Sequence, residues 1–323
     1  MWLLLLALVG LTLLYRWYRQ NRILKNLSDK YVFITGCDTG FGKLLAKKLD
    51  KRGMKVLAAC LTDAGAENLK SETSSRVQTV VFDVTDGKGV RAAADWVEQL
   101  VKGEGLWGLV NNAGISIPIA PNGWLNKDDF VKVLNVNLLG MIDVTLNLLP
   151  LIIRARGRII NVSSVMGRLA FVGGGYSISR FGIEAFSDSM RRELRTFGVR
   201  VSLIEPCSYK TLATDVGTTL QSLHSLWTRA PQWAKETYGQ QYFEVYCKFI
   251  QYRLSKCNPH VNQVIDCMEH ALTSVYPWTR YSAGWITKLF YLPVSYLPTV
   301  MSDYLLALPL PMPPCSLTSN ITE

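Results

Sequence analysis

The residues best suited to chemistry are a tyrosine, an arginine and a serine near the middle of the chain. Tyr176 and Arg180 lie four residues apart, and Ser164 lies twelve residues before the tyrosine. If this stretch is helical, that spacing places the phenol and the guanidinium on one face. A phenol in water ionises only at a pH of ~10, and a neighbouring cation favours the ionised form. The set therefore suits proton exchange with an alcohol or carbonyl oxygen that the serine hydroxyl holds in place.

A glycine-rich turn far upstream suits a dinucleotide. It stands between an apolar run and a helical pattern and contains Gly36, Asp38, Thr39, Gly40, Phe41 and Gly42. Glycines here let backbone N–H groups approach a pyrophosphate at the N-terminus of a helix. Asp83, after the third predicted strand, can accept a hydrogen bond from an adenine amino group. Asn111, Ala113 and Gly114, after the fourth, can hold the chain close to the cofactor, which favours this interpretation over an ordinary turn.

The choice between NAD and NADP depends on the 2′ position of the adenosine ribose. A 2′-phosphate usually needs a nearby arginine or lysine, whereas a 2′-hydroxyl is usually bound by a carboxylate. The second predicted strand ends in Cys60, Leu61 and Thr62, which supply no cation. Because Asp38 would repel a phosphate, we expect NAD.

Apolar strand patterns alternate with helical patterns through most of the chain. Strands are predicted over Tyr31–Thr35, Lys55–Cys60, Val77–Phe82, Leu106–Val110, Arg158–Val162 and Val199–Ile204. Helices are predicted over Gly42–Lys51, Val90–Val101, Asp128–Ile153, Tyr176–Phe197 and Val264–Ser274. Continuous apolar strands separated by helices predict a parallel sheet covered on both faces. We therefore expect a single α/β domain over residues 30–285, doubly wound as in Rossmann-type folds.

The alternation is lost over residues 208–260. Aromatic residues recur there at roughly helical spacing, at Trp227, Trp233, Tyr238, Tyr242, Phe243 and Tyr246. They suit either a helical insertion packed on the body or a lid over an apolar substrate cleft. Both interpretations can hold together.

The two ends of the chain suit contact with a membrane. Residues 2–14 carry no charge, and Arg16, Arg19, Arg22 and Lys25 follow them. We predict an uncleaved membrane anchor over 1–18 and a basic linker over 19–29. A cleaved signal peptide, which would leave a soluble secreted protein, normally has its basic residues before the apolar run. The apolar segment 286–323 suits an interfacial membrane contact or packing on the core.

Composition narrows the range of partners. The net charge is +10, but the basic residues are scattered rather than gathered with interleaved aromatics, so we expect no nucleic-acid partner. The seven cysteines are odd in number and show no paired framework, which favours reduced thiols. Pairs such as Cys257 with His260 and Cys267 with His270 lack an established zinc spacing, and we expect no metal site.

The chain resembles the short-chain dehydrogenase/reductase superfamily, and within it the microsomal retinol dehydrogenase and 17β/3α-hydroxysteroid dehydrogenase group. The resemblance spans nearly the whole chain and is carried by the motifs at 35–42, 105–114, 156–167, 184–189 and 281–285. It implies that Ser164 binds the substrate oxygen and that Tyr176 acts as general acid and base. It further implies that residue 180 holds the nicotinamide ribose, that Asn137 supports a water relay and that the loop with Thr211 contacts the nicotinamide.

The resemblance also implies a substrate and a location. The expected reaction is NAD-dependent oxidation of a lipophilic alcohol, either retinol or a hydroxysteroid, at the endoplasmic reticulum membrane. A further copy of the chain, in a homo-oligomer, is also possible as a partner.

Two residues depart from the family pattern. Arg180 stands where the family has lysine, and Cys207 stands where it has glycine. Arginine keeps the positive charge, but its planar fork is bulkier than an ammonium group and does not deprotonate. The alternative to an efficient enzyme is therefore a relative that binds NAD or a lipid with little turnover.

Overall fold

The structure is a computed structural model that describes residues 2–308 and 311. The part of the predicted C-terminal tail beyond these positions lies outside the described residues.

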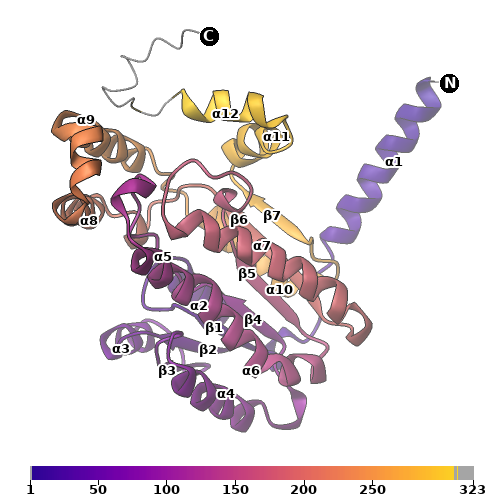
Figure 1. Cartoon of the computed structure of the whole chain (residues 1–323). Coiled ribbons are helices and arrows are strands. Elements are labelled where there is room, and N and C mark those ends of the chain that lie inside the picture. The colour runs from indigo at the N-terminus through magenta and orange to yellow at the C-terminus, as the bar shows by residue number, and fades with distance from the viewer. Residues whose placement is uncertain (1, 309–310, 312–323) are drawn as a thin grey trace.

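A seven-stranded parallel sheet forms the centre of the domain (Figure 1). Its order is β3-β2-β1-β4-β5-β6-β7, so the winding direction reverses between β1 and β4. The strands are β1 (Tyr31–Thr35), β2 (Lys55–Cys60), β3 (Val77–Val81), β4 (Gly108–Asn111), β5 (Arg158–Val162), β6 (Arg200–Pro206) and β7 (Arg280–Ala283). The doubly wound fold predicted from the sequence is confirmed. The edge strand β7 was not predicted as a strand.

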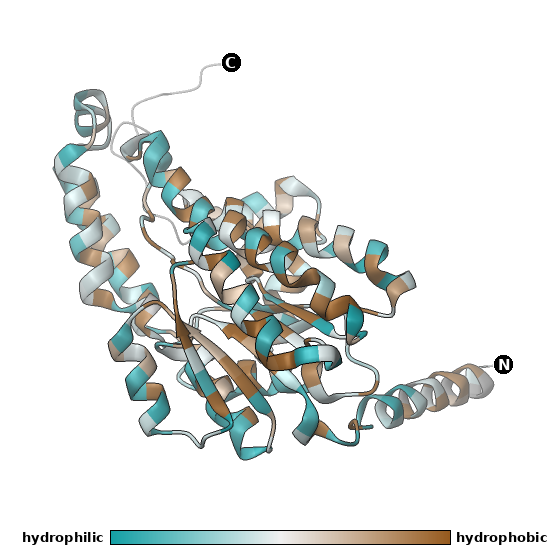
Figure 2. Ribbon diagram, turned by 90° about the horizontal axis from the view of Figure 1, so that it is seen from below, coloured by the Kyte–Doolittle hydropathy of each residue, from teal (hydrophilic) through white to brown (hydrophobic). Residues whose placement is uncertain are grey.

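Helices cover both faces of this sheet. They are α2 (Gly40–Lys51), α3 (Asp63–Ser71), α4 (Gly87–Val101), α5 (Lys127–Leu134), α6 (Met141–Arg154), α7 (Gly175–Glu193) and α10 (Asn262–Thr273). Side chains alternate along β1, so that Val32 and Ile34 join the core on one face and Phe33 joins the core on the other. Figure 2 shows the apolar strands enclosed by helices that carry their polar residues outward.

The long helix predicted over Asp128–Ile153 is interrupted. A π-helical segment, η4 (Asn135–Gly140), separates α5 from α6. The run Lys127–Arg154 is long and apolar enough to cross a membrane, but 44% of its most apolar stretch is buried. Because α6 packs against α4, and α5 against α7, we interpret the run as a core element.

The N-terminal helix α1 (Trp2–Gln20) extends away from the domain (Figure 1). Its base is fixed to the body. The carbonyl of Gln20 accepts hydrogen bonds from His270 Nε2 at 2.9 Å and from Ser274 Oγ at 3.1 Å. The Arg19 guanidinium lies 4.0 Å from the ring centroid of Tyr276. The predicted linker over 19–29 is therefore attached to the end of α10.

The insertion over 208–260 contains α8 (Val216–Arg229) and α9 (Gln232–Ser255), the latter kinked at Gly239. Trp124, 1% exposed, inserts its ring among aromatic residues of these helices. Its neighbours, at centroid distances of 4.8 to 6.1 Å, are Trp227, Tyr238, Tyr242, Phe243 and Tyr246. The aromatic residues thus pack the insertion onto the body.

A buried network of carboxylates and arginines joins the elements behind the reactive residues. Arg168 Nε lies 2.7 Å from Glu205 Oε1, and Arg280 Nη1 lies 2.6 Å from Glu184 Oε2. Ser282 Oγ donates to Glu205 at 3.1 Å. Burial, reinforced by the charge of Glu205, raises the pKa of Glu184 to about 7. The network connects α7 and the segment after Ser164 to β6 and β7.

This raised pKa predicts a pH-dependent stability. Between the ordinary value of 4.5 and about 7, folded Glu184 keeps a proton that the unfolded chain releases, so the free energy of unfolding falls as pH rises through that window. We expect a shallower fall between about pH 5 and about pH 7.5 in Glu184→Gln than in the unsubstituted protein, measured by urea denaturation in detergent. Glu98→Gln, at an exposed glutamate paired with Arg154, should keep the unsubstituted slope. Equal slopes in all three proteins would contradict the assignment.

Candidate active site

A cavity of about 730 Å³ opens at the carboxyl ends of the strands, where the sheet order reverses. Such crevices are the usual ligand sites of open α/β sheets. Most of the predicted site residues line it, namely Gly36, Asp38, Thr39, Gly40, Phe41, Asp83, Ala113, Gly114, Ser164, Tyr176, Arg180 and Thr211. One continuous space therefore connects the glycine turn with the tyrosine and the serine.

Two glycines of the turn, Gly36 and Gly42, have no room for a side chain. A Cβ added to Gly36 would lie 2.9 Å from Ala113 Cα, and one added to Gly42 would lie 2.3 Å from the Gly36 carbonyl oxygen. Gly40 has a φ of +60° where α2 begins. The backbone is thereby left bare at the N-terminus of a twelve-residue helix. These residues fit the pyrophosphate of a dinucleotide. Gly42 itself does not line the cavity, since it packs behind the turn.

Asp38 connects the glycine turn to the end of β2. Its carboxylate accepts hydrogen bonds from Leu61 N at 2.8 Å, from Thr62 N at 3.0 Å and from Thr62 Oγ1 at 2.8 Å. The end of β2 is where folds of this type bind the adenosine ribose. A negative charge is thus fixed beside the expected 2′ position.

The turn after β4 contains one residue that we predicted to contact the cofactor and that lies elsewhere. The Asn111 side chain is buried and donates to Thr145 Oγ1 and to Asn161 Oδ1, both at 2.8 Å. The next residue, Asn112, lines the cavity and donates to the carbonyls of Thr35 at 2.9 Å and Gly36 at 3.1 Å. The amide at the cavity is therefore that of Asn112. Alternation along β4 was the available signal, because adjacent residues at a strand end face opposite ways.

Asn137 lies within the π-helical segment and does not line the cavity. Its Oδ1 accepts from Ile115 N at 2.8 Å, and its Nδ2 donates to Ile115 O at 2.9 Å and to Ser179 Oγ at 3.0 Å. The side chain therefore holds the segment after Gly114 against α7. The π-helical turn, a feature frequent at functional sites, marks the position.

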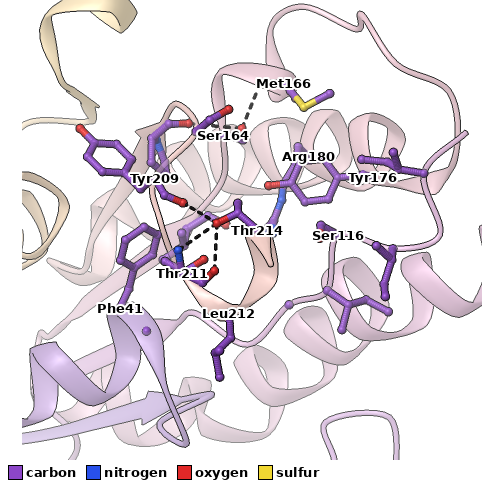
Figure 3. A pocket seen from close by; sticks show the side chains of 18 of the residues that line it. Phe41, Ser116, Ser164, Met166, Tyr176, Arg180, Tyr209, Thr211, Leu212 and Thr214 are labelled. Atoms are coloured by element: carbon purple, nitrogen blue, oxygen red, sulfur yellow. Dashed lines mark hydrogen bonds between the residues drawn. The ribbon is translucent and has the colours of Figure 1, made fainter. Parts of the chain in front are cut away.

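Ser164 and Tyr176 lie on the same wall of the cavity (Figure 3). Ser164 Oγ accepts from Met166 N at 3.2 Å and donates to the Pro206 carbonyl at 3.3 Å. These contacts fix the serine between the segment after β5 and the end of β6. Tyr176 occupies the first turn of α7, so its position depends on how that helix begins.

Arg180 lies one turn further along α7, against the tyrosine. Its Cζ lies 4.7 Å from the centroid of the Tyr176 ring, and its Nη1 donates to the Val162 carbonyl at 2.9 Å. Arg180 is 7% exposed, and its guanidinium approaches Gly114, where an added Cβ would lie 3.0 Å from Nη2. The side chain thus supplies positive charge at the phenol, while one edge is bound to the backbone of β5.

Cys207 follows Pro206 and also lines the cavity. Burial raises the pKa of its thiol above the ordinary value, so the residue stays protonated near neutral pH. It packs in an apolar cluster with Phe171 and Tyr291. Its contribution to the cavity is therefore apolar packing.

One wall of the cavity comes in part from the segment after β7, which was not predicted to line it. The segment after β7 forms η8 (Thr287–Tyr291), α11 (Leu292–Val294) and α12 (Thr299–Ala307), which pack on the domain. The cavity lining from η8, α12 and α9 consists of Phe249, Ile250, Arg253, Leu254, Phe290, Tyr291, Leu305 and Leu306. Part of the predicted insertion and part of the predicted tail therefore line the cavity, and the role of the insertion as a substrate lid stays a prediction. The high apolar content of both segments was the available signal.

Comparison with known proteins agrees with this geometry. A family profile described as short chain dehydrogenase matches residues 30–219. Rat retinol dehydrogenase 7 is 56% identical over 303 residues, covering 94% of this chain and 96% of that protein. Human 17-beta-hydroxysteroid dehydrogenase type 6 is 54% identical over 313 residues, covering 97% and 99%.

A solved structure supports the fold. A short chain dehydrogenase/reductase from Burkholderia phymatum, in complex with NAD, superposes with a TM-score of 0.68 at 20% identity, covering 87% of this chain and 97% of that one. Since the family profile matches more than half of the sequence and both relatives match nearly all of it, the chain belongs to the short chain dehydrogenase family.

Proposed function

We propose that this protein is a membrane-bound, NAD-dependent dehydrogenase that oxidises a lipophilic alcohol, of the retinol or hydroxysteroid class, to the carbonyl. One observation carries the proposal: a single cavity joins the glycine turn to Ser164 and Tyr176 and continues between apolar lid residues. The names of the relatives, retinol dehydrogenase and 17-beta-hydroxysteroid dehydrogenase, support the substrate class.

Each of the three residues Ser164, Tyr176 and Arg180 has a separate role in the proposed reaction. The glycine turn at Gly36 and Gly40 would hold a dinucleotide, which when bound would supply the hydride acceptor for the carbinol carbon. Ser164 Oγ holds the substrate oxygen, and Tyr176 removes the carbinol proton. The Arg180 guanidinium, 4.7 Å from the centroid of the phenol ring, places a positive charge beside the tyrosine. Apolar walls exclude water and strengthen these electrostatic interactions.

The preference for NAD is supported by the position of Asp38. Its carboxylate lies at the end of β2 and would repel a 2′-phosphate. The residues that follow that strand, Leu61 and Thr62, offer no compensating cation.

We propose that α1 anchors the protein in the endoplasmic reticulum membrane. The helix has nineteen residues, and most of its described side chains are exposed apolar groups. Its uncharged run covers residues 2–14, and Tyr15, Trp17 and Tyr18 extend the apolar surface, so the span is at the short limit of the roughly 17–25 apolar residues that cross a bilayer. Arg16 and Arg19 follow the apolar run, which favours the catalytic body on the cytoplasmic side.

Washed membranes from cells that express the full chain provide the test. We expect NADH to form with all-trans-retinol or with androstane-3α,17β-diol, and NADP to support a lower rate. Tyr176→Phe should lower kcat by roughly 10²-fold or more, because the proton acceptor is removed. The activity should stay in the pellet after an alkaline wash. A rate equal to that of Tyr176→Phe would defeat the enzymatic proposal, and activity in the wash would defeat the anchor.

A second candidate function is binding of NAD or a lipid with little turnover. The observation that favours it is the Arg180 guanidinium, which donates to the Val162 carbonyl and crowds Gly114. A lysine ammonium is smaller and has three rotatable donors for ribose hydroxyls and water. The retained charge beside Tyr176 weighs in favour of the enzyme.

Arg180→Lys separates the two candidates. If the guanidinium limits turnover, the substitution should raise kcat by about tenfold, since the compact ammonium restores donors to the ribose. Arg191→Lys is the matched control, because Arg191 lies on the same helix, pairs with Asp188 and does not line the cavity. An unchanged or lower kcat in Arg180→Lys would show that arginine is compatible with full activity.

A further inference from the structure

Two cations lie among the described residues that line the cavity, Arg180 and Arg253. Arg180 belongs to the reacting centre, but Arg253 comes from the last turn of the lid helix α9. Its Nη2 donates to the Tyr291 hydroxyl at 3.1 Å. Arg253 is exposed, whereas Tyr291 is 7% exposed, so the pair reaches from the rim of the cavity to its wall.

The surroundings of this pair are apolar. The Phe171 ring stacks on Tyr291 with centroids 5.7 Å apart, and Leu305 and Leu306 of α12 pack in the same cluster. Phe249 and Ile250 line the cavity one turn before Arg253 on α9. A few polar groups in an apolar wall are the usual means by which a binding site selects the orientation of its ligand.

The pair is close to the reacting centre but separate from it. Cys207 packs in the same apolar cluster as Tyr291, and both residues line the cavity with Arg253. Cys207 is the residue after Pro206, whose carbonyl accepts from Ser164. A carbinol at Ser164 and Tyr176 therefore leaves Arg253 and Tyr291 to meet another part of the same substrate.

An interaction with the helix dipole does not account for this arrangement. A cation in the last turn of α9 is favourable by itself. Lys256, at the end of the same helix, meets that need outside the cavity, 5.5 Å from the Tyr252 ring. The helix dipole therefore does not explain why the Arg253 side chain points toward the Tyr291 hydroxyl in the cavity wall.

We infer that Arg253 and Tyr291 bind a second oxygen of the substrate, a hydroxyl or ketone distinct from the reacting carbinol. The inference rests on the proposed function and favours one of its two substrate classes, the hydroxysteroids. A hydroxysteroid with oxygens at both ends of its skeleton uses the pair, whereas retinol presents only hydrocarbon beyond its carbinol. A guanidinium has five donors, and a tyrosine hydroxyl can also donate, so the ligand group needs only to accept.

Matched ligands and matched variants test the inference. We expect the unsubstituted protein to favour androstane-3α,17β-diol over the better of androstan-3α-ol and androstan-17β-ol, which lack the second oxygen. The ratio of kcat/KM for the diol to kcat/KM for the better mono-alcohol should be about tenfold or more. A mono-alcohol leaves the donors of Arg253 and Tyr291 without a hydrogen-bond acceptor, which disfavours its binding. Arg253→Met and Tyr291→Phe should each reduce this ratio toward one. Lys256→Met, which removes a charge from the same helix end, should leave the ratio unaltered.

Equilibrium dialysis of the three labelled steroids against the same proteins separates this inference from the proposed function. If neither all-trans-retinol nor any of the steroids is oxidised, the dehydrogenase proposal fails, but tighter binding of the diol that depends on Arg253 still supports the second-oxygen site. Equal binding of diol and mono-alcohols by the unsubstituted protein overturns it. So does a loss of preference in Lys256→Met equal to that in Arg253→Met.

Discussion

The close approach of two turns at the carboxyl edge of the sheet is the constraint on which the site depends. The turn after β1 and the turn after β4 meet so tightly that neither Gly36 nor Gly42 has room for a methyl group. Thr35 Oγ1 accepts from the backbone N–H groups of Asn112 and Ala113, both at 3.0 Å, and holds the turns together. The cavity exists because backbone, rather than side chains, occupies this point where the winding of the sheet reverses.

Successive turns of α7 carry different tasks. Tyr176 faces the cavity, Arg180 lies against the tyrosine, and Glu184 pairs with Arg280 of the edge strand β7. An i,i+4 spacing thus links the phenol to its cation and then links the cation-bearing turn to a buried ion pair. The placement of the reacting groups is determined by one rigid helix whose far side is fixed to the last two strands of the sheet.

The sequence was sufficient for the sheet but not for all of the site. Hydrophobic runs located β1 and β2 to the residue, because buried parallel strands are continuously apolar. The edge strand β7 alternates in burial and has only four residues, so its pattern is weak. The interruption of the long helix at Asn135–Gly140 was also not predicted, because a π-helical turn adds a residue without changing the amino-acid composition of the segment. Arg253 could not be placed from sequence, because its contact with Tyr291 joins two elements that only the tertiary fold brings together.

The attachment of α1 has a consequence for how the protein meets its substrate. Gln20 accepts from His270 and Ser274, and Arg19 covers Tyr276, so the foot of the helix is a rigid joint rather than a tether. With α1 in a bilayer, as proposed, the catalytic body keeps a constant height and tilt above the lipid surface. On that arrangement the local concentration of an apolar substrate would be set by its partitioning into the leaflet rather than by its solubility in water.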